Sequence, residues 1–405
     1  MENLSVAKAD WFLRPETQAV FACLNREGFE ARAVGGAVRN ALLGEPVTEV
    51  DFATAARPED TLRLAAEAGI KTAPTGIGHG TVTLIVNGVP FEVTTLRRDV
   101  ATDGRHATVE FGSDWAADAR RRDFTMNALY ADRSGEVYDP LGGASDLFAR
   151  RVRFVGDPAT RIREDYLRIL RFFRFSAQYA EGDFDREGVA AAIRERLGLQ
   201  RLSRERIRAE LLRILAARRA PDAIEIMDES GLLLLILGGV ARRKRFERLC
   251  RIEAALDMPP DPLLRLASLG LFIEEDAARL SAKLRLSSQE TNELLGLAAP
   301  APEITAGLGK SELEAWLYRL GPRLYLGRVL LAFASPATPE DDATSAFAVR
   351  LADSWERPKF PVGGADLIAK GWSPGAALGE ELKRLEELWI ASGFNLSREA
   401  LLGLG

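Results

Sequence analysis

Two acidic residues, Glu49 and Asp51, stand at alternate positions of the apolar run TEVDFAT. Side chains at positions i and i+2 of a β-strand point to the same face, so a strand here would hold both carboxylates close together. Two like charges at that spacing need a cation, and Mg²⁺ is a hard ion that takes oxygen ligands and shares them with substrate phosphates. The pair predicts a magnesium site. The alternative is an exposed sheet edge with two solvated acids.

A pair of glycines, Gly35 and Gly36, separates the apolar run at 31–34 from a helical pattern that contains Arg39. Glycines at such a junction let backbone N–H groups approach a phosphate, and the helix N-terminus and Arg39 add positive charge. We therefore predict a phosphate-binding turn. The alternative is that the glycines only join a strand to a helix.

Charged residues recur at three- and four-residue steps between 161 and 171, which predicts one polar face of a helix. Cytosine and adenine each place an exocyclic amine beside a ring-nitrogen acceptor, so a carboxylate and a guanidinium together fit both bases. Uracil and guanine would leave such groups unpaired, at about 1–3 kcal/mol each. The alternative is a row of salt bridges on a solvated helix. The charged residues are Arg161, Glu164, Asp165, Arg168 and Arg171, and the apolar face would carry Tyr166, Ile169, Leu170 and Phe173.

Five motifs in this order and spacing resemble the class II tRNA nucleotidyltransferase and bacterial poly(A) polymerase superfamily, which is of polymerase-β type. The resemblance is dense from 30 to 215 and looser over the helical remainder. The motifs are VGGAVRN at 34–40, EVD at 49–51, HGT at 79–81 followed by FEVTTLR at 91–97, RRDFTMNA at 121–128, and REDYLRILR at 163–171.

The resemblance implies a role for each matching residue. The triphosphate-binding turn would comprise Gly35, Gly36 and Arg39, and the metal ligands would be Glu49 and Asp51. Nucleotide binding and ribose recognition would fall to Arg121, Arg122, Asp123 and Asn127, and base recognition to Glu164, Asp165, Arg168 and Arg171.

Three acidic or amide positions qualify that assignment. The family usually has Asp at both metal positions, so Glu49, one methylene longer, implies retained but altered metal geometry. Asn40 also stands where Asp is common. Glu92 in the strand FEVTT would be a third metal-facing carboxylate that helps to deprotonate the attacking hydroxyl or to orient the metals. The alternative for Glu92 is a structural acid of the sheet.

The implied activity is template-independent addition of C, C and A to the 3′ end of tRNA from CTP and ATP. The terminal 3′-OH would attack the α-phosphate in line, with two Mg²⁺ ions as cofactor. Poly(A) polymerase is the nearest alternative, but Gly78 to Val86 lacks the basic-aromatic signature typical of that subfamily. The segment 97–108 resembles the mobile loop that supports the switch from C to A addition, and its full length favours CCA addition. An alternative of another class is a non-catalytic RNA-binding protein on a decayed transferase head.

An α+β head must position these residues. Period-two or apolar patterns predict strands at 31–34, 48–54, 81–86, 91–96 and 127–131. Turn-rich sequence between 138 and 158 ends this mixed region, and helical patterns dominate beyond it. We expect a polymerase-β-type catalytic head with a mixed sheet and helices over 1–150, an all-α neck with the base-reading helix over 151–220, and an all-helical body and tail for tRNA binding over 221–405.

Arginine is concentrated in the predicted neck. Residues 150–219 contain 18 arginines, no lysine and ten acidic residues, a net charge of +8, whereas the whole chain carries −5. Such a belt could hold the phosphates of tRNA by shape, since A-form RNA shows little sequence to side chains. The alternative is a set of solvated helix faces with salt bridges.

Composition excludes several classes of protein. The two cysteines, Cys23 and Cys250, lie far apart in a 405-residue chain, which excludes a disulfide framework and a zinc ribbon. The longest apolar run, at 231–241, is about half of what a membrane span needs. The first residues show no secretory or transit pattern. We expect a cytoplasmic protein that binds no membrane, and the sequence implies no protein partner.

Overall fold

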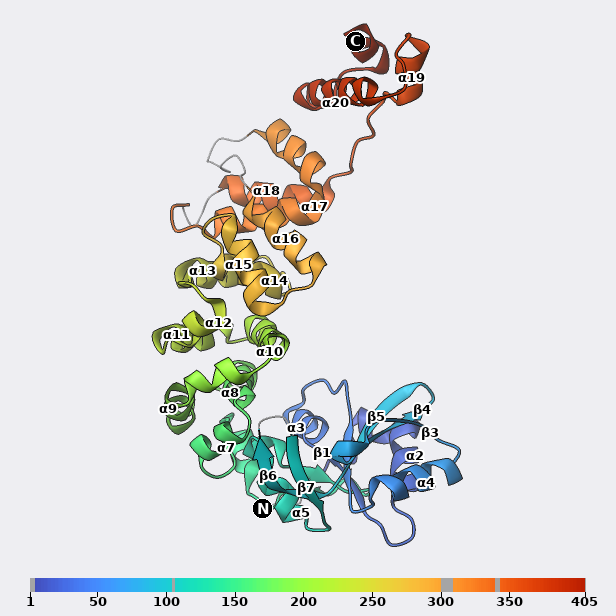
Figure 1. The fold of residues 1–405 in the computed structure, drawn as a ribbon, viewed down its shortest axis with the longest axis vertical. Coiled ribbons are helices and arrows are strands. Elements are labelled where there is room, and N and C mark those ends of the chain that lie inside the picture. The colour runs from blue at the N-terminus through green and yellow to red at the C-terminus, as the bar shows by residue number, and fades with distance from the viewer. Residues whose placement is uncertain (1–3, 104–105, 300–308, 339–342, 405) are drawn as a thin grey trace. The chain divides into compact units, whose positions relative to one another are not determined.

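The computed structural model describes residues 4–103, 106–299, 309–338 and 343–404 (Figure 1). Their contacts divide the chain into two compact units, Met1–Ile236 and Leu237–Gly405. All strands among the described residues belong to the first unit, and the second unit is helical there. None of the described helices is both long and apolar enough to cross a membrane.

A mixed seven-stranded sheet forms the centre of the first unit, in the order β3-β4-β5-β2-β1-β8-β9. Strands β2 and β5 pair in parallel, and the other neighbours are antiparallel. A separate pair of strands, β6 and β7, forms a two-stranded sheet. The strand bounds are β1 Ala31–Val34, β2 Asp51–Thr54, β3 Lys71–Gly76, β4 Thr81–Val86, β5 Val89–Thr95, β6 Arg97–Asp103, β7 His106–Phe111, β8 Tyr130–Ala131 and β9 Val137–Tyr138.

Helices α2 and α4 pack on part of this sheet. Alternate residues of the strands point apolar side chains toward these helices. The Phe52 ring of β2 contacts the Phe21 ring of α2 with centroids 4.9 Å apart, and Leu64 of α4 is fully buried. The helices of the head are α1 Asp10–Leu13, α2 Pro15–Leu24, α3 Gly36–Leu43, α4 Pro58–Glu67, α5 Trp115–Arg120 and α6 Gly143–Phe148, with 3₁₀ turns η1 Ile77–His79 and η2 Thr125–Asn127.

Helix α8 joins the head to the remaining helices of the first unit. Its apolar face packs against α10 and α11, and its phenylalanines pack on the chain around η2. The Phe124 ring lies 5.1 Å from that of Phe175, and Phe154 stacks on Phe172 at 5.4 Å. The helices are α7 Pro158–Glu164, α8 Leu167–Tyr179, α9 Arg186–Arg194, α10 Arg204–Ala216, α11 Ala220–Glu229 and α12 Leu232–Leu237, with the 3₁₀ turn η3 Arg196–Arg201.

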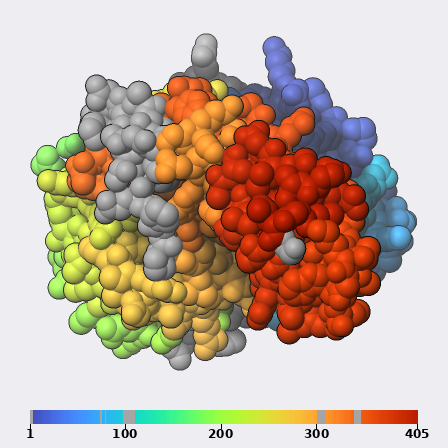
Figure 2. Space-filling model, turned by 90° about the horizontal axis from the view of Figure 1, so that it is seen from above, coloured from blue at the N-terminus to red at the C-terminus, as the bar shows by residue number. Residues whose placement is uncertain are grey.

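The second unit contains a buried ion pair and a C-terminal apolar cluster. Arg265 Nε lies 2.6 Å from Glu253 Oε2, and both side chains are buried. Near the C-terminus, Leu367, Leu385 and Trp389 pack into one apolar cluster. The C-terminal part of the chain is coloured red in Figure 2. The helices are α13 Arg243–Ala255, α14 Pro262–Gly270, α15 Glu275–Leu284, α16 Ser288–Ala298, α17 Lys310–Phe333, α18 Ala343–Ser354, α19 Gly364–Ala369, α20 Ala376–Ala391 and α21 Arg398–Gly403.

The predicted fold class, an α+β head followed by helices, is confirmed. The strands predicted at 31–34 and 81–86 have the predicted bounds, whereas the one predicted at 127–131 begins as the 3₁₀ turn η2 and continues as the short β8. The loop predicted over 97–108 contains strand β6 and the first residues of β7, and its residues 104–105 lie outside the described residues. The division near 150 and 220 stays a prediction.

The ion pair between Glu253 and Arg265 predicts a specific stability pattern. Glu253→Ala would leave the buried guanidinium without its carboxylate, so we expect the free energy of unfolding to fall by about 3–5 kcal/mol. Replacing both residues by apolar ones, Glu253→Met with Arg265→Leu, should cost far less, because no charge stays buried. Urea denaturation measures both variants. Equal losses in the two would show that the unpaired buried charge is not the source of the cost.

Candidate active site

The candidate carboxylates meet where β2 and β5 run side by side. Asp51 is the first residue of β2, and the parallel pair Phe52 and Val93 places Glu92 next to it. The strand pairing therefore brings together two acids that are 41 positions apart in the sequence. Parallel neighbours at one level point to the same face of a sheet, so the two carboxylates can act on one ligand.

Glu49 lies two residues before β2, so the prediction of one strand over 48–54 is wrong at its start. Strand β1 ends at Val34, which pairs with Asp51, because the chain turns into helix α3 at Gly35. Residues before Asp51 therefore have no residue of β1 opposite them with which to pair. Asp51 lies in a strand, as predicted, but Glu49 does not, so strand alternation does not explain why the two carboxylates are close. The irregular segment 44–50 brings Glu49 near Asp51.

Electrostatic coupling indicates that the three acids share one environment. The pKa of Asp51 is raised to about 6, first by partial removal of water from the carboxylate and then by the negative charges of Glu92 and Glu49. The positive charge of Arg122 opposes this rise. A bound cation would relieve the repulsion, so these carboxylates fit a divalent metal.

The described part of the chain contains no group of three or more His, Cys, Asp or Glu side chains arranged to hold a metal ion by themselves. Glu49 and Asp51 would thus supply two oxygen ligands, and substrate phosphates and water the others, as is usual for small hard cations. The carboxylates border a polar cavity of about 540 Å³. It is lined by Gly36, Arg39, Asn40, Glu45, Pro46, Val47, Thr48, Glu49, Asp51, Arg174, Gln178, Tyr179 and Arg213.

The glycine turn is a tight connection beside this cavity. Gly35 has φ +70° and ψ −117°, a conformation that side-chain-bearing residues rarely adopt. Its N–H donates to the Leu129 carbonyl at 3.1 Å, so that group does not face a ligand. A Cβ at this position would lie 3.8 Å from Arg122 Nη1, which places that guanidinium at the turn. Gly36 begins α3 and lines the cavity.

Arg39 lines the cavity and is bound to protein groups in this structure, and its predicted role in phosphate binding stays a prediction. It is only 7% exposed, and its guanidinium donates to Asn127 Oδ1 at 2.5 Å and to the Tyr179 hydroxyl at 2.8 Å. The Tyr179 ring also lies 4.3 Å below the guanidinium carbon. These partners are 88 and 140 residues away in sequence, so the spacing of the motif alone could not reveal them. Arg39 holds α3 against η2 and α8.

Asp118 is a residue of the site that was not predicted from the sequence. It is fully buried and lies 2.6 Å from Arg121 Nη2 and 3.0 Å from Arg122 Nη2, and it accepts from the Tyr130 hydroxyl at 2.7 Å. Burial alone would raise the pKa of Asp118, but the two arginines hold it below the ordinary value. The signal was present as D-x-x-R-R, because residues three and four apart meet on a helix.

Asp123 and Arg171 link the head to α8. Arg171 Nη2 lies 2.5 Å from Asp123 Oδ2, and Asn127 Nδ2 donates to the other carboxylate oxygen at 3.0 Å. Burial would raise the pKa of Asp123, yet Arg171 and the hydrogen bond from Asn127 lower it to about 2. The carboxylate is therefore ionised at neutral pH and holds α8 in place.

The base-reading residues do not lie on one continuous helix, which corrects the prediction. Helix α7 ends at Glu164, Asp165 is extended with φ −153° and ψ 107°, and α8 begins at Leu167. The Asp165 carboxylate accepts from the Leu167 N–H at 3.1 Å, a local bond that competes with helix continuation. Its other oxygen accepts from Arg206 Nη2 at 2.7 Å.

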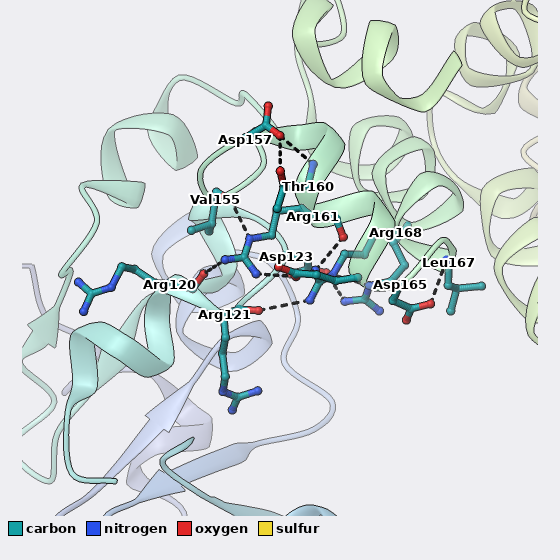
Figure 3. Close-up of polar contacts among 12 residues, drawn as sticks. Arg120, Arg121, Asp123, Val155, Asp157, Thr160, Arg161, Asp165, Leu167 and Arg168 are labelled. Atoms are coloured by element: carbon teal, nitrogen blue, oxygen red, sulfur yellow. Dashed lines mark hydrogen bonds and ion pairs between the residues drawn. The ribbon is translucent and has the colours of Figure 1, made fainter. Parts of the chain in front are cut away.

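Two of the four candidate base readers, Asp165 and Arg168, point in different directions (Figure 3). Arg168 pairs with Glu164 and donates to the Arg121 carbonyl at 3.3 Å, whereas Asp165 turns toward Leu167. Arg161 also pairs with Glu164, at 2.6 Å. A second cavity, of about 560 Å³, is bordered by Arg121, Arg161 and Glu164. The predicted apolar face is confirmed for Ile169, Leu170 and Phe173, which are fully buried.

Comparisons with known proteins agree with this geometry. Residues 31–153 match the family model for the poly A polymerase head domain, and 186–242 match the model for the probable RNA and SrmB-binding site of polymerase A. The mitochondrial CCA tRNA nucleotidyltransferase 1 of Mus musculus is 34% identical over 96% of this chain and 91% of its own. The chain belongs to the CCA-adding family of tRNA nucleotidyltransferases.

Bacterial members of this CCA-adding family are similar at comparable coverage. The CCA-adding enzyme of Anoxybacillus flavithermus is 32% identical over 91% of this chain and 90% of its own. The crystal structure of the Bacillus stearothermophilus CCA-adding enzyme in complex with CTP is 26% identical, with a TM-score of 0.72 over 97% of each chain. Because the mouse relative is mitochondrial by name, the cytoplasmic location stays a prediction.

The clamp around Asp118 predicts a combined loss. Asp118→Asn would leave two arginines beside a neutral buried amide, so we expect the free energy of unfolding to fall by about 3–5 kcal/mol. Nucleotide affinity should fall as well, since Arg121 and Arg122 lose their shared anchor. Thermal denaturation and fluorescent-nucleotide binding measure the two effects.

Asp157→Asn is the control, because Asp157 caps helix α7 from an exposed position outside both cavities and Asn caps equally well. It should leave both measurements close to those of the unaltered protein. If Asp118→Asn behaved like this control, the clamp would have no role.

Proposed function

We propose that this protein adds C, C and A to the 3′ end of tRNA from CTP and ATP without a nucleic-acid template, with Mg²⁺ as the cofactor. The single observation that carries the proposal is the acidic cluster of Asp51, Glu92 and Glu49 in a chain that matches CCA-adding enzymes over nearly its whole length. Mg²⁺ held there would activate the terminal 3′-OH and stabilise the leaving pyrophosphate.

The protein's own side chains would bind and orient the substrates. Arg122, at the glycine turn and near Asp51, is placed to neutralise phosphate charge. Asp165 and Arg168 would turn from their present partners to accept from the base amine and donate to the ring nitrogen. Asp123 and Arg171 would hold α8 at a fixed position, so that the selected nucleotide lies near the carboxylates. The arginines of 150–219 would contact tRNA phosphates.

Product sequencing tests the activity directly. The purified protein would receive tRNA transcripts that end at the discriminator base, together with CTP, ATP, UTP or GTP alone and with CTP and ATP combined. We expect two C with CTP alone and a complete CCA end with CTP and ATP. Long A tails would instead identify a poly(A) polymerase, and tRNA binding without incorporation would identify a non-catalytic RNA-binding protein.

Removal of the Asp51 charge tests the metal assignment. We expect Asp51→Asn to lower the rate of incorporation by about 1000-fold or more, because one metal ligand that stabilises the transition state is lost. Binding of tRNA, measured by gel shift, should change little. Asp60→Asn, on the exposed face of α4, is the control and should retain the rate. Unchanged turnover in Asp51→Asn would refute the assignment.

Substitution of Asp165 tests the base-reading assignment. Asp165→Asn exchanges an acceptor oxygen for an amide donor, so we expect the preference for CTP over UTP, as a ratio of kcat/KM values, to fall about 10- to 100-fold. The ratio separates base reading from general damage, which lowers both rates together. Asp157→Asn is the control, because Asp157 caps the adjacent α7 and Asn keeps that function. A ratio that does not move would show that Asp165 only supports the fold.

A further inference from the structure

Asn40, in the last turn of α3, makes three side-chain hydrogen bonds to three different parts of the first unit. Its Oδ1 accepts from Arg39 Nε at 3.0 Å and from the Tyr179 hydroxyl at 3.1 Å. Its Nδ2 donates to the Pro46 carbonyl at 2.7 Å. The orientation of the amide is fixed, because a guanidinium can only donate and a carbonyl can only accept.

The helix itself does not need this side chain. Gly44 takes the left-handed conformation and donates its N–H to the Asn40 and Ala41 carbonyls, and the Glu45 N–H donates to the Asn40 carbonyl at 2.8 Å. These backbone bonds already complete the C-terminus of α3. Two of the three bonds of the Asn40 side chain, those with Tyr179 and Pro46, therefore serve contacts outside the helix.

One of those contacts controls the segment that carries Glu49. Residues 44–50 form neither helix nor strand, so the sheet does not set the position of Glu49. The bond from Asn40 to the Pro46 carbonyl ties this segment to α3, three residues before Glu49. Asn40, Pro46 and Glu49 all line the cavity of about 540 Å³ that contains Asp51.

The other contact leads to α8. Tyr179 is 4% exposed, and its hydroxyl accepts from Arg39 while it donates to Asn40. It lies eight residues after Arg171, about 12 Å along the helix at 1.5 Å per residue. The contacts between α8 and the head thus include one at Asp123 through Arg171 and one at Asn40 through Tyr179.

We propose that Asn40 is a positioning residue that couples α8 to the segment 44–50, so that the helix carrying Arg168 and Arg171 also sets the position of Glu49. The expected effect on kcat rests on the proposed function, whereas the expected effect on the structure of 44–50 rests on the hydrogen bonds alone. Tyr179 is the second positioning residue of this link.

Asn40→Asp tests the link with a change of almost no volume, because it keeps the oxygen that accepts from Arg39 and Tyr179, replaces the donor to the Pro46 carbonyl by a second oxygen, and adds one negative charge. We expect kcat to fall about tenfold with both CTP and ATP, with KM for each nucleotide within about twofold. The control is Asn25→Asp, since Asn25 donates in the same way to the Phe21 and Ala31 carbonyls but lies outside the cavity. It should affect stability and leave kcat unchanged.

Hydrogen exchange gives a readout that does not depend on activity. Tyr179→Phe removes one hydroxyl and keeps the ring beside Arg39, at a position 130 residues from Glu49. At the shortest labelling times we expect exchange in the peptide spanning 44–50 to rise about tenfold in Tyr179→Phe and in Asn40→Asp. Exchange in α2 and α4 should stay as in the unaltered protein.

The outcomes separate this inference from the proposed function. Faster exchange at 44–50 in a protein that adds no nucleotide would support the link and overturn the proposed function. Unchanged exchange at 44–50 in Tyr179→Phe would overturn the link, even in a protein that adds CCA. A tenfold loss of kcat in the Asn25→Asp control, equal to that in Asn40→Asp, would reduce Asn40 to a structural role and also overturn it.

Discussion

Repulsion among the acids at the seam between β2 and β5 is the constraint on which the site depends. The parallel pairing of these strands forces Asp51 next to Glu92, and the segment before β2 brings Glu49 close to both. A fold gains no stability from like charges held together, and the pKa of Asp51 is raised first by burial of its carboxylate and then by the charges of Glu92 and Glu49. Such a cluster is understandable when a divalent cation and substrate phosphates complete it.

The surrounding structure keeps positive charge at fixed distances from that cluster. Asp118 forms ion pairs with Arg121 and Arg122, so these guanidinium groups stay ordered before any nucleotide binds. Asp123 does the same for Arg171 on α8. Three carboxylates of the head thus fall into two kinds. Asp118 and Asp123 are buried and paired with arginine, with lowered pKa values, whereas Asp51 faces a cavity with a raised one.

Local sequence patterns predicted the elements and many of the site residues, but not their partners. The glycine turn, the presence of a strand that contains Asp51 and the apolar face of α8 follow from conformational and periodic rules that act over a few residues. The contacts of Arg39 with Asn127 and Tyr179 were not predicted, because they exist only after the head and α8 pack. The helical periodicity did not reveal the break at Asp165, because the hydrogen bond from the Leu167 N–H to the Asp165 carboxylate favours a non-helical backbone there. Asp118 could have been found from its spacing to Arg121 and Arg122.

Anomalous diffraction from crystals of the protein grown with Mn²⁺ and a non-hydrolysable CTP analogue tests the central claim most directly. The repulsion at the β2–β5 seam predicts an anomalous peak within about 2.5 Å of carboxylate oxygens of Glu49 and Asp51, with the triphosphate on the same side. A peak and a triphosphate bound elsewhere, with these acids uncoordinated, would contradict the claim that the acidic cluster is the metal site.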